Sequence, residues 1–452
     1  MRPLVSTVIH NRAALATTPA HETALACLDA GIDAARPERV VREAVALDGT
    51  TLAVGPERHD LAAYDSVVVL GGGNAAAHVA AALADILGGA LDGGVVVTDD
   101  PVATTTVEVL PASHPIPSQQ GVDSTRTLLE RAEQVDEDTL VLGVVTGGGS
   151  ACMVAPAEGI SLGDVQATTD ALLDSGAAIH EINAVRKHCS ALKGGRLARA
   201  LAPARVTACV LSDVVGNDFD VIASGPLVPD SSTYDDALDV LSAYDLSVPD
   251  AIRTRLEAGA AGEIDETPGP DDSAFERVTT HCIGTTMTAL AAAREPAEER
   301  GYDTLVLSSR LRGIARDAAL THVAVAEEML DTGNPITPPA VVLSGGETTV
   351  SVTGDGRGGP NQEFALAAAL GLPDGAVLAA VDTDGIDGNS TVAGAVVDGE
   401  TVRDREAARR ALDGNDATGY LTERDAVVET GRTGTNVNDM HVLVVGARSE
   451  RG

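Results

Sequence analysis

Residues 66–87 read SVVVLGGGNAAAHVAAALADIL, and this stretch indicates the fold of the chain. The aliphatic run at its start is typical of a buried strand, and the alanine-rich segment after Asn74 is typical of a helix. Three glycines join the two, and glycine allows both a tight turn and a close approach of the backbone to a ligand. The stretch therefore predicts a strand, a glycine-rich turn and a helix, which is the repeating unit of α/β domains.

The same order of features recurs along the chain. Further aliphatic runs, each followed by a glycine-rich or aspartate-containing loop, begin near residues 141, 206, 281, 304, 339 and 376. We therefore expect an α/β protein with two α/β domains and mostly parallel or mixed sheets. The acidic, Pro- and Gly-rich stretch 257–276 is the predicted linker between an N-terminal domain, residues 1–256, and a C-terminal domain, residues 277–452.

The charge of the chain excludes several classes of partner. Of 452 residues, 31 are basic and 67 are acidic, so the net charge is −36. Such a surface repels the phosphates of nucleic acids and anionic lipids, and we expect neither as a partner. The N-terminal residues do not resemble a signal peptide, and no stretch reaches the roughly 18 apolar residues of a membrane helix. These features predict a cytoplasmic protein, and the sequence leaves open whether it forms a homodimer.

The acidic surface also predicts a dependence on salt. Many carboxylates, with arginine in place of lysine, are typical of proteins adapted to concentrated salt. At 1 M salt the Debye length is about 3 Å, so the repulsion among surface carboxylates is screened. We expect the melting temperature to fall when KCl is diluted from molar to low concentration. Melting curves that are independent of KCl would contradict this halophilic interpretation.

Two glycine-rich loops are the first candidates for ligand binding. GGGNAAA (71–77) and TGGGSAC (146–152) each follow a predicted strand, and ligands of parallel sheets bind outside the carboxyl ends of the strands. Neither loop matches GxGxxG, a P-loop or a nucleophile elbow, and each is also compatible with an ordinary strand-to-helix turn. The candidate substrate- or phosphate-binding residues are Gly71, Gly72, Gly73, Asn74, Gly147, Gly148, Gly149 and Ser150.

Carboxylates that directly follow strands are candidate metal ligands. Asp213 follows the run near 206, and Asp382 and Asp384 follow the run near 376. Mg²⁺ takes hard oxygen ligands and commonly bridges to substrate phosphates. Acidic loops are common in a chain with 67 carboxylates, so the alternative is that these three residues are ordinary surface groups.

Two further glycine-rich stretches, 344–370 and 431–442, carry polar side chains next to tight backbone turns. Taken separately, each stretch is ambiguous. The candidate site residues in these stretches are Glu347, Arg357, Asn361, Thr433 and Asn436.

The use of lysine is the most unusual feature of the composition. The chain has only two lysines, Lys187 and Lys193, and both lie in NAVRKHCSALKGGR (183–196). A helical projection of this stretch places Asn183, Arg186 and both lysines on one polar face, opposite an apolar face. The face could simply be solvated. A compact ammonium group can also bind a phosphate as a point charge, so we predict that Lys193, Lys187 and Arg186 bind an anionic substrate.

At these residues the sequence resembles the class II glycerate kinases, the glycerate 2-kinase family with a MOFRL-type C-terminal domain. The resemblance extends from about residue 60 to 446. Its blocks are SHPIPSQQG (113–121), TGGGSA (146–151), INAVRKH with LKGGRLA (182–198), SDVVGND with IASGPLVPD (212–230), LSGGETTV with GRGGPNQEFALA (343–367), DTDGIDG (382–388) and TGTNVNDM (433–440).

The resemblance implies transfer of the γ-phosphoryl group of ATP to the 2-hydroxyl of D-glycerate, with Mg²⁺ as a cofactor. It also implies a Rossmann-like N-terminal domain and an active site in the cleft between two α/β domains. In that site Lys193, Lys187 and Arg186 would lie near the glycerate carboxylate and the transferred phosphoryl group. Asp213 and Asp382 or Asp384 would lie near the metal, and Arg357 would be a further catalytic cation.

Two departures from the family pattern remove positive charge. The first glycine loop commonly reads GKAA in the family, and here Asn74 stands at the lysine position. The family motif GRGGRNQE here reads GRGGPNQE, so Pro360 replaces an arginine while Arg357 remains. These departures leave open a non-catalytic or altered-substrate binder of sugar acids. An NAD(P)H-dependent hydroxypyruvate reductase, a label sometimes given to relatives in this family, is a second open alternative.

Overall fold

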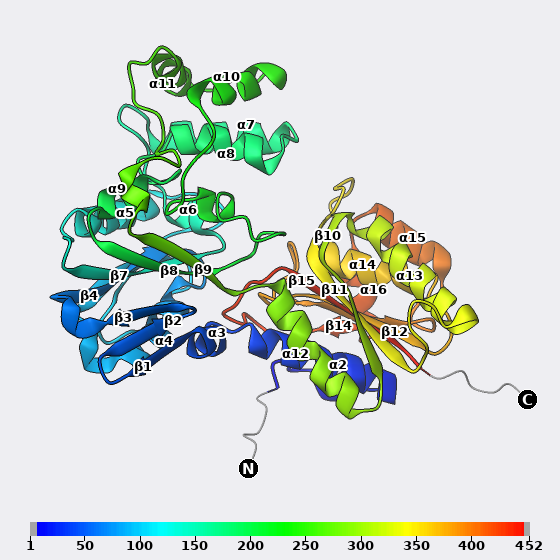
Figure 1. Cartoon of the computed structure of the whole chain (residues 1–452). Coiled ribbons are helices and arrows are strands. Elements are labelled where there is room, and N and C mark those ends of the chain that lie inside the picture. The colour runs from blue at the N-terminus through cyan, green and yellow to red at the C-terminus, as the bar shows by residue number, and fades with distance from the viewer. Residues whose placement is uncertain (1–6, 447–452) are drawn as a thin grey trace, which may run out of the picture. The chain divides into compact units, whose positions relative to one another are not determined.

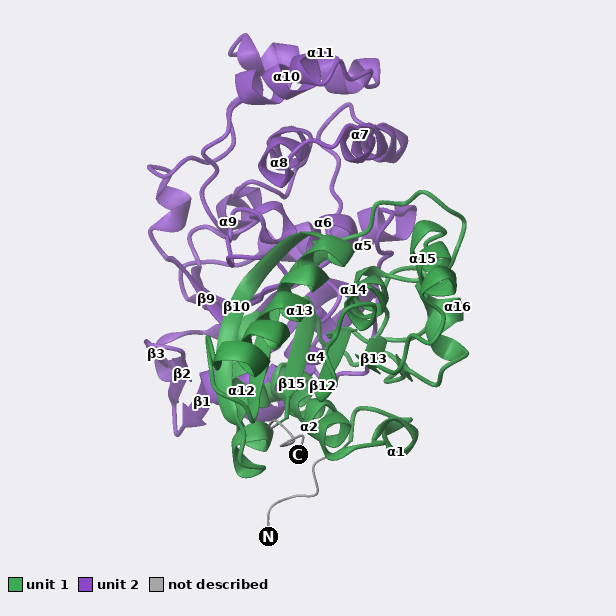
Figure 2. Ribbon diagram, turned by 90° about the vertical axis from the view of Figure 1, so that its right-hand side faces the viewer, with its two compact units in different colours: residues 1–39, 284–452 green, residues 40–283 purple. Residues whose placement is uncertain are grey.

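The computed structural model describes residues 7–446 of the chain (Figure 1). These residues divide into two compact units, which are coloured separately in Figure 2. Unit 2 comprises residues 40–283, and unit 1 comprises residues 1–39 together with 284–452. Among residues 7–446, no helix is both long and apolar enough to cross a membrane.

Unit 2 contains the predicted Rossmann-like sheet. Its strand order is β6-β5-β4-β7-β8-β9, and the pairs from β6 through β8 are parallel. Numbered along the chain, this is the order 3-2-1-4-5-6 of a doubly wound dinucleotide-binding fold. The strands are β4 (Ser66–Gly72), β5 (Gly93–Thr98), β6 (Glu108–Pro111), β7 (Thr139–Thr146), β8 (Arg205–Leu211) and β9 (Val278–Gly284), and β1 (Val45–Asp48), β2 (Thr51–Val54) and β3 (Glu57–Asp60) form a separate antiparallel sheet.

Helices cover both faces of this sheet. Val69 of β4 packs in a cluster with α4, while Leu70 faces a second cluster that includes residues of α5 and α9. Both faces are buried because successive side chains of a strand point in opposite directions. The helices of the unit are α3 (Pro37–Ala44), α4 (Ala76–Leu87), α5 (Gln119–Ala132), α6 (Gly149–Cys152), α7 (Leu162–Asp174), α8 (Ile179–His188), α9 (Arg196–Leu201), α10 (Tyr234–Ala243) and α11 (Asp250–Ala260).

Unit 1 is a second α/β unit with a mixed sheet of order β10-β11-β15-β12-β13-β14. Only the β10–β11 pair is parallel, and the other pairs are antiparallel. Its strands are β10 (Asp303–Ile314), β11 (Ala340–Thr349), β12 (Ala376–Asp382), β13 (Gly394–Asp398), β14 (Val427–Val428) and β15 (Asp439–Val445). Its helices are α1 (Arg12–Leu15), α2 (Pro19–Ala34), α12 (Thr286–Glu299), α13 (Ala315–Thr332), α14 (Pro360–Ala369), α15 (Arg405–Asp413) and α16 (Ala417–Thr422).

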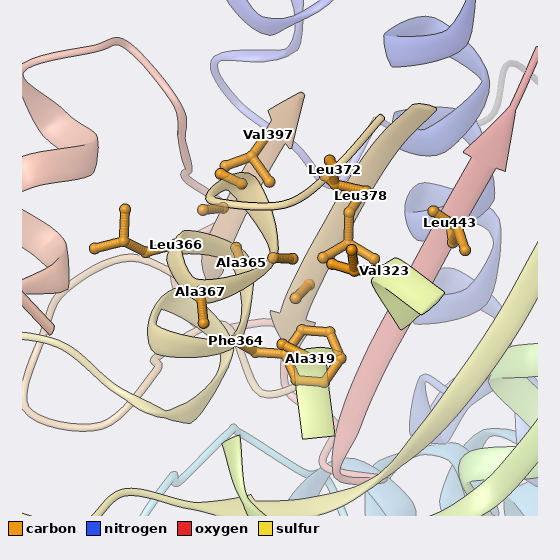
Figure 3. Close-up of a cluster of buried hydrophobic side chains, with 14 of the residues drawn as sticks. Ala319, Val323, Phe364, Ala365, Leu366, Ala367, Leu372, Leu378, Val397 and Leu443 are labelled. Atoms are coloured by element: carbon orange, nitrogen blue, oxygen red, sulfur yellow. The ribbon is translucent and has the colours of Figure 1, made fainter. Parts of the chain in front are cut away.

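The core of unit 1 is built almost entirely from aliphatic side chains (Figure 3). Phe364 of α14 lies in one cluster with Leu378 of β12 and Leu443 of β15, and all three are fully buried. Alanines fill the positions between them, so α14 lies close to the sheet. This packing fixes the N-terminus of α14 next to the loop that follows β12.

The predicted domain boundaries differ from the observed units at two places. Residues 1–39 were expected in the N-terminal domain, but α2 packs against α12 and β15 of unit 1. A Cβ atom on Gly31 of α2 would lie 2.6 Å from the Met440 sulfur, so the glycine permits this close approach. The predicted linker 257–276 lies inside unit 2, because β9 returns the chain to that sheet and unit 1 resumes at Gly284.

Candidate active site

Three loops of unit 2 meet at the carboxyl ends of the adjacent strands β4, β7 and β8. The amide of Asn74, after β4, donates a hydrogen bond to the carbonyl oxygen of Gly147, after β7, at 2.8 Å. A Cβ atom on Gly148 would collide with the Asn74 amide, and one on Gly147 would collide with the Asp213 carboxylate. The glycines are therefore needed for these loops to touch. The two predicted glycine loops and Asp213 thus form one structural feature.

Asn74 occupies the position where the family that the sequence resembles commonly carries lysine. Its side-chain oxygen accepts a hydrogen bond from the Cys152 thiol at 3.6 Å, and its amide nitrogen lies 3.4 Å from Nδ1 of His114. The main-chain oxygen of Asn74 accepts a hydrogen bond from Thr98 at 2.9 Å. These contacts hold Asn74 in the loop, but a neutral amide supplies no positive charge there.

A pocket of about 220 Å³ opens beside the Gly148–Ser150 loop. Lys193 and Arg186 both line it, and no Asp or Glu is among the lining residues. The lining also contains the polar residues His114, Ser150, Thr168, Thr169 and Ser190. The remainder of the wall is mainly aliphatic.

Lys193 is held at this pocket by the backbone. Its side chain is almost fully buried, and Nζ donates hydrogen bonds to the carbonyl oxygens of Ser150 and Met153, both at 2.9 Å. Burial, together with the positive charge of Arg186, lowers the pKa of Lys193 to about 7. A bound anion would favour the charged ammonium group, so this lysine is suited to binding a phosphate or carboxylate.

Arg186 has no ion pair with any residue in the described range 7–446. Its guanidinium is partly buried, and burial lowers its pKa. An unpaired, partly desolvated arginine is unusual in a chain with a net charge of −36. The arrangement favours an anionic ligand in the pocket.

Ser224 lies next to Ser150 and was not among the residues predicted from the sequence. Its hydroxyl lies 2.7 Å from Ser150 Oγ and donates to Oδ1 of Asn183 at 3.0 Å. Ser224 has φ +60°, and its neighbours Ala223 and Gly225 also have positive φ values of +52° and +61°. A left-handed Ala-Ser pair costs free energy and has no clear sequence signal. The predicted residue Asn183 is therefore connected to Ser150 through Ser224.

The structure places Lys187 away from the pocket, in contrast to the helical projection. Its Nζ forms ion pairs with Asp220 and, at 3.1 Å, with Asp230, and the side chain is buried. The projection fails because α8 ends at His188, after which Ser190 pairs with Pro156 and the glycines 194 and 195 adopt positive φ. Lys193 consequently lies outside any helix, and the two lysines point to different sites.

The acidic residues predicted in unit 1, Asp382 and Asp384, are half-buried and lie close together. Asp382 lies opposite Asp439 in the register of β12 and β15, and Oδ1 of Asp382 accepts a hydrogen bond from the amide of Asp384 at 3.0 Å. Burial, together with the negative charges of Asp384 and Asp439, raises the pKa of Asp382 well above its usual range. Asp439 was not among the predicted residues. Among residues 7–446, no group of three or more His, Cys, Asp or Glu side chains is arranged to hold a metal by itself.

The other predicted residues of unit 1 mainly stabilise loops. The Asn361 amide donates to Asp387 at 3.2 Å and to Asp439 at 2.6 Å, and Thr433 donates to the Thr383 carbonyl oxygen at 2.6 Å. Asn436 accepts a hydrogen bond from the amide of Asn438 at 3.0 Å. The side chains of Glu347 and Arg357 are exposed.

Pro360, which replaces the second arginine of the family motif, is the first residue of α14. Proline is favourable at this position because the first amide of a helix has no partner within the helix. The substitution is therefore compatible with the fold, although it removes a positive charge.

Comparison with known proteins identifies the family. A family model described as a domain of unknown function, DUF4147, matches residues 23–257, and the MOFRL family model matches residues 340–439. A D-glycerate 2-kinase of Thermotoga maritima is 40% identical over 75% of this chain and 80% of its own length. A glycerate 2-kinase of Pyrococcus horikoshii is 39% identical over 76% of this chain and 79% of its own length.

Solved structures agree with these matches. A crystal structure of a protein from Pyrococcus horikoshii has a TM-score of 0.81 and 36% identity, and the match covers 96% of this chain and 100% of that one. A Thermotoga maritima glycerate kinase (EC 2.7.1.31) also has a TM-score of 0.81 and 36% identity, covering 94% and 99%. From the two family models, the relatives and the shared fold, we conclude that the chain belongs to the MOFRL-containing family of glycerate kinases.

Proposed function

We propose that this chain transfers the γ-phosphoryl group of ATP to the 2-hydroxyl of D-glycerate and forms 2-phosphoglycerate. The observation that carries the proposal is the pair of cations, Arg186 and Lys193, that line a pocket without carboxylates. The relatives described above are named as glycerate kinases and agree with this activity.

The chemistry of phosphoryl transfer consists mostly of positioning and charge neutralisation. In the proposed site, Lys193 and Arg186 neutralise negative charge on the substrates. The glycine loops 71–73 and 147–149 allow the backbone to approach them closely. Ser224 and Asn183 keep the hydroxyl of Ser150 oriented, and Lys187 contributes by stabilising the structure around the pocket rather than by touching substrate. These roles of individual residues are part of the proposal.

Magnesium is the implied cofactor, and the acidic residues are compatible with it. The half-buried carboxylate of Asp382 favours a neighbouring positive charge, since desolvation and like charges have raised its pKa. Mg²⁺ commonly uses one or two carboxylates together with substrate phosphates. Asp213 in unit 2 is one candidate to hold it, and Asp382 with Asp384 in unit 1 is a separate candidate. When bound, the ion would neutralise charge on the phosphates.

Asp213 gives the proposed activity a pH dependence. Burial raises the pKa of Asp213 to about 6, although backbone amides, including that of Gly148, oppose the shift. A metal ligand or a general base must be ionised, so kcat/KM should fall as the pH is lowered through about 6. We expect Asp213→Asn to lose most of the activity together with this acid limb. A pH profile from 5 to 8 at constant ionic strength measures both effects, and an unchanged profile in the variant would exclude the role.

The direct test of function is an assay with ATP, Mg²⁺ and D-glycerate in molar KCl. The expected product is 2-phosphoglycerate, which an enolase-coupled assay distinguishes from 3-phosphoglycerate. Formation of the 3-isomer would correct the regiochemistry, and the absence of either product would reject the glycerate kinase proposal. If calorimetry then showed binding of ATP and glycerate without turnover, the protein would be a non-catalytic binder.

A hydroxypyruvate reductase is the second candidate. A relative from Agrobacterium vitis that is 39% identical over 76% of this chain and 90% of its own length carries a provisional name as such a reductase. The loop at residue 71 lacks the third glycine of a dinucleotide-binding fingerprint, which argues against this function. Oxidation of NADH or NADPH in the presence of hydroxypyruvate would support the reductase function. The absence of such oxidation would exclude it.

A further inference from the structure

We propose that the pocket beside Lys193 binds the adenosine part of ATP along its aliphatic wall, with the phosphates at its cationic end. The inference rests on the proposed kinase function and assigns one of its two substrates to a specific pocket. It follows from the combination of two different surfaces in one cavity.

The first surface is the aliphatic wall. Val165 and Leu173 of α7, Val185 of α8 and Ile252 of α11 line the pocket. These helices belong to a group of four, with α10, that pack on one another beyond the sheet layers of unit 2 (Figures 1 and 2). Leu173 remains 57% exposed, although its side chain borders the pocket. The wall therefore offers an apolar surface that the protein itself leaves partly uncovered.

The second surface is the cationic end. Arg186 has no ion pair among residues 7–446, and Lys193 has a pKa lowered to about 7 by burial. Both line the pocket next to Gly148 and Ser150. With no carboxylate in the lining, this end favours a ligand that carries negative charge.

The two surfaces together distinguish between the substrates. D-Glycerate has a carboxylate and two hydroxyls on three carbons. An aliphatic wall would remove water from these polar groups without replacing the lost hydrogen bonds. A purine ring has two apolar faces and polar edges, and a nucleotide joins it to a chain of phosphates. Thr168, a buried hydroxyl in the same wall, donates to the carbonyl oxygen of Asp164 at 2.7 Å and can still accept a hydrogen bond from an amino group. ATP therefore matches both ends of the pocket.

Substitution of the exposed leucine of the wall tests the inference. Leu173→Asp places a negative charge beside the nucleotide and removes an apolar contact, whereas Leu173→Asn removes the contact alone. Leu320→Asp is the matched control, since Leu320 lies on α13 of unit 1 and is exposed to nearly the same extent, 58%. We expect the KM for ATP to rise about tenfold or more in Leu173→Asp and to rise less in Leu173→Asn. The KM for glycerate should stay within about twofold in both variants, and the control should match the wild type.

Several outcomes would overturn the assignment. A rise in the KM for glycerate alone would assign the pocket to the sugar acid, and unchanged KM values for both substrates would show that neither uses the wall. Inorganic tripolyphosphate binding as tightly as ATP in calorimetry would show that the adenosine adds nothing.

Failure of the kinase proposal remains distinguishable from failure of this one. If the wild type forms no phosphoglycerate, calorimetry with ADP still reports on the pocket. Binding of ADP that Leu173→Asp weakens and Leu320→Asp does not would support the inference, whereas equal binding by the wild type and both variants would reject it.

Discussion

Lys193→Met should reduce kcat for glycerate phosphorylation by about 10²–10³-fold, the usual cost of removing one group that stabilises charge in a transition state. The ammonium group lines the pocket next to Ser150, and Arg186 is the only other cation in its lining. Methionine fills a similar volume, so the packing of the buried side chain is retained. The measurement is steady-state kinetics in molar KCl.

The stability of Lys193→Met should stay close to that of the wild type. The carbonyl oxygens of Ser150 and Met153 lose a donor, at a cost of about 1 kcal/mol each. Removal of a buried ammonium group recovers part of that cost, because burial, together with the positive charge of Arg186, has lowered the pKa of Lys193 to about 7. Thermal melts should therefore separate a loss of activity from a loss of folding.

The pH profile gives a second readout for Lys193. The ammonium form binds the anion and is lost as the pH rises through about 7, so kcat/KM of the wild type should decline on the alkaline side. This decline should be absent from the residual activity of Lys193→Met. A variant that turns over at nearly the wild-type rate with the same profile would show that Lys193 takes no part in the reaction.

The sequence predicted the local units of this fold correctly because their signals are local. The stretch 66–87 became β4, a glycine turn and α4, and each further aliphatic run became a strand from β7 to β12. The positions of Asn74, Gly147 and Asp213 at one edge of the sheet follow from parallel strands whose carboxyl ends lie together. The hydrophobic pattern of the sequence and the parallel order of the strands were therefore sufficient to predict where these three residues lie.

The errors arose where distant residues decide the structure. The packing of α2 in unit 1 depends on Gly31 and Met440, which are separated by most of the chain. The helical projection of residues 183–196 assumed a continuous helix, but α8 ends at His188. The left-handed conformation of Ser224 is likewise imposed by its surroundings, since serine rarely adopts it unaided. None of these features has a period or a motif in the sequence.

Substitution of the buried Lys187 should reduce the stability of the protein rather than its kcat, in contrast to substitution of Lys193. Lys187→Met should destabilise unit 2 by about 3–5 kcal/mol, because it leaves the carboxylates of Asp220 and Asp230 without their shared cation. The larger cost comes from the unpaired carboxylate of Asp230, since its side chain is fully buried and its Oδ2 has no hydrogen-bond partner. A loss of this size corresponds to a fall of about 10 °C in melting temperature for a unit of this length.

The double variant Lys187→Met, Asp230→Asn separates the loss of the ion pair from a general loss of packing. It replaces the unpaired carboxylate of Asp230 with a neutral amide, so part of the lost stability should return even though a second charged group has been removed. The coupling follows because the two side chains are in contact, and contacting pairs are not additive. For the fraction that stays folded, kcat of Lys187→Met should remain near the wild-type value, since the lysine does not line the pocket. A stable Lys187→Met with greatly reduced kcat would instead return this lysine to the catalytic role that the sequence analysis gave it.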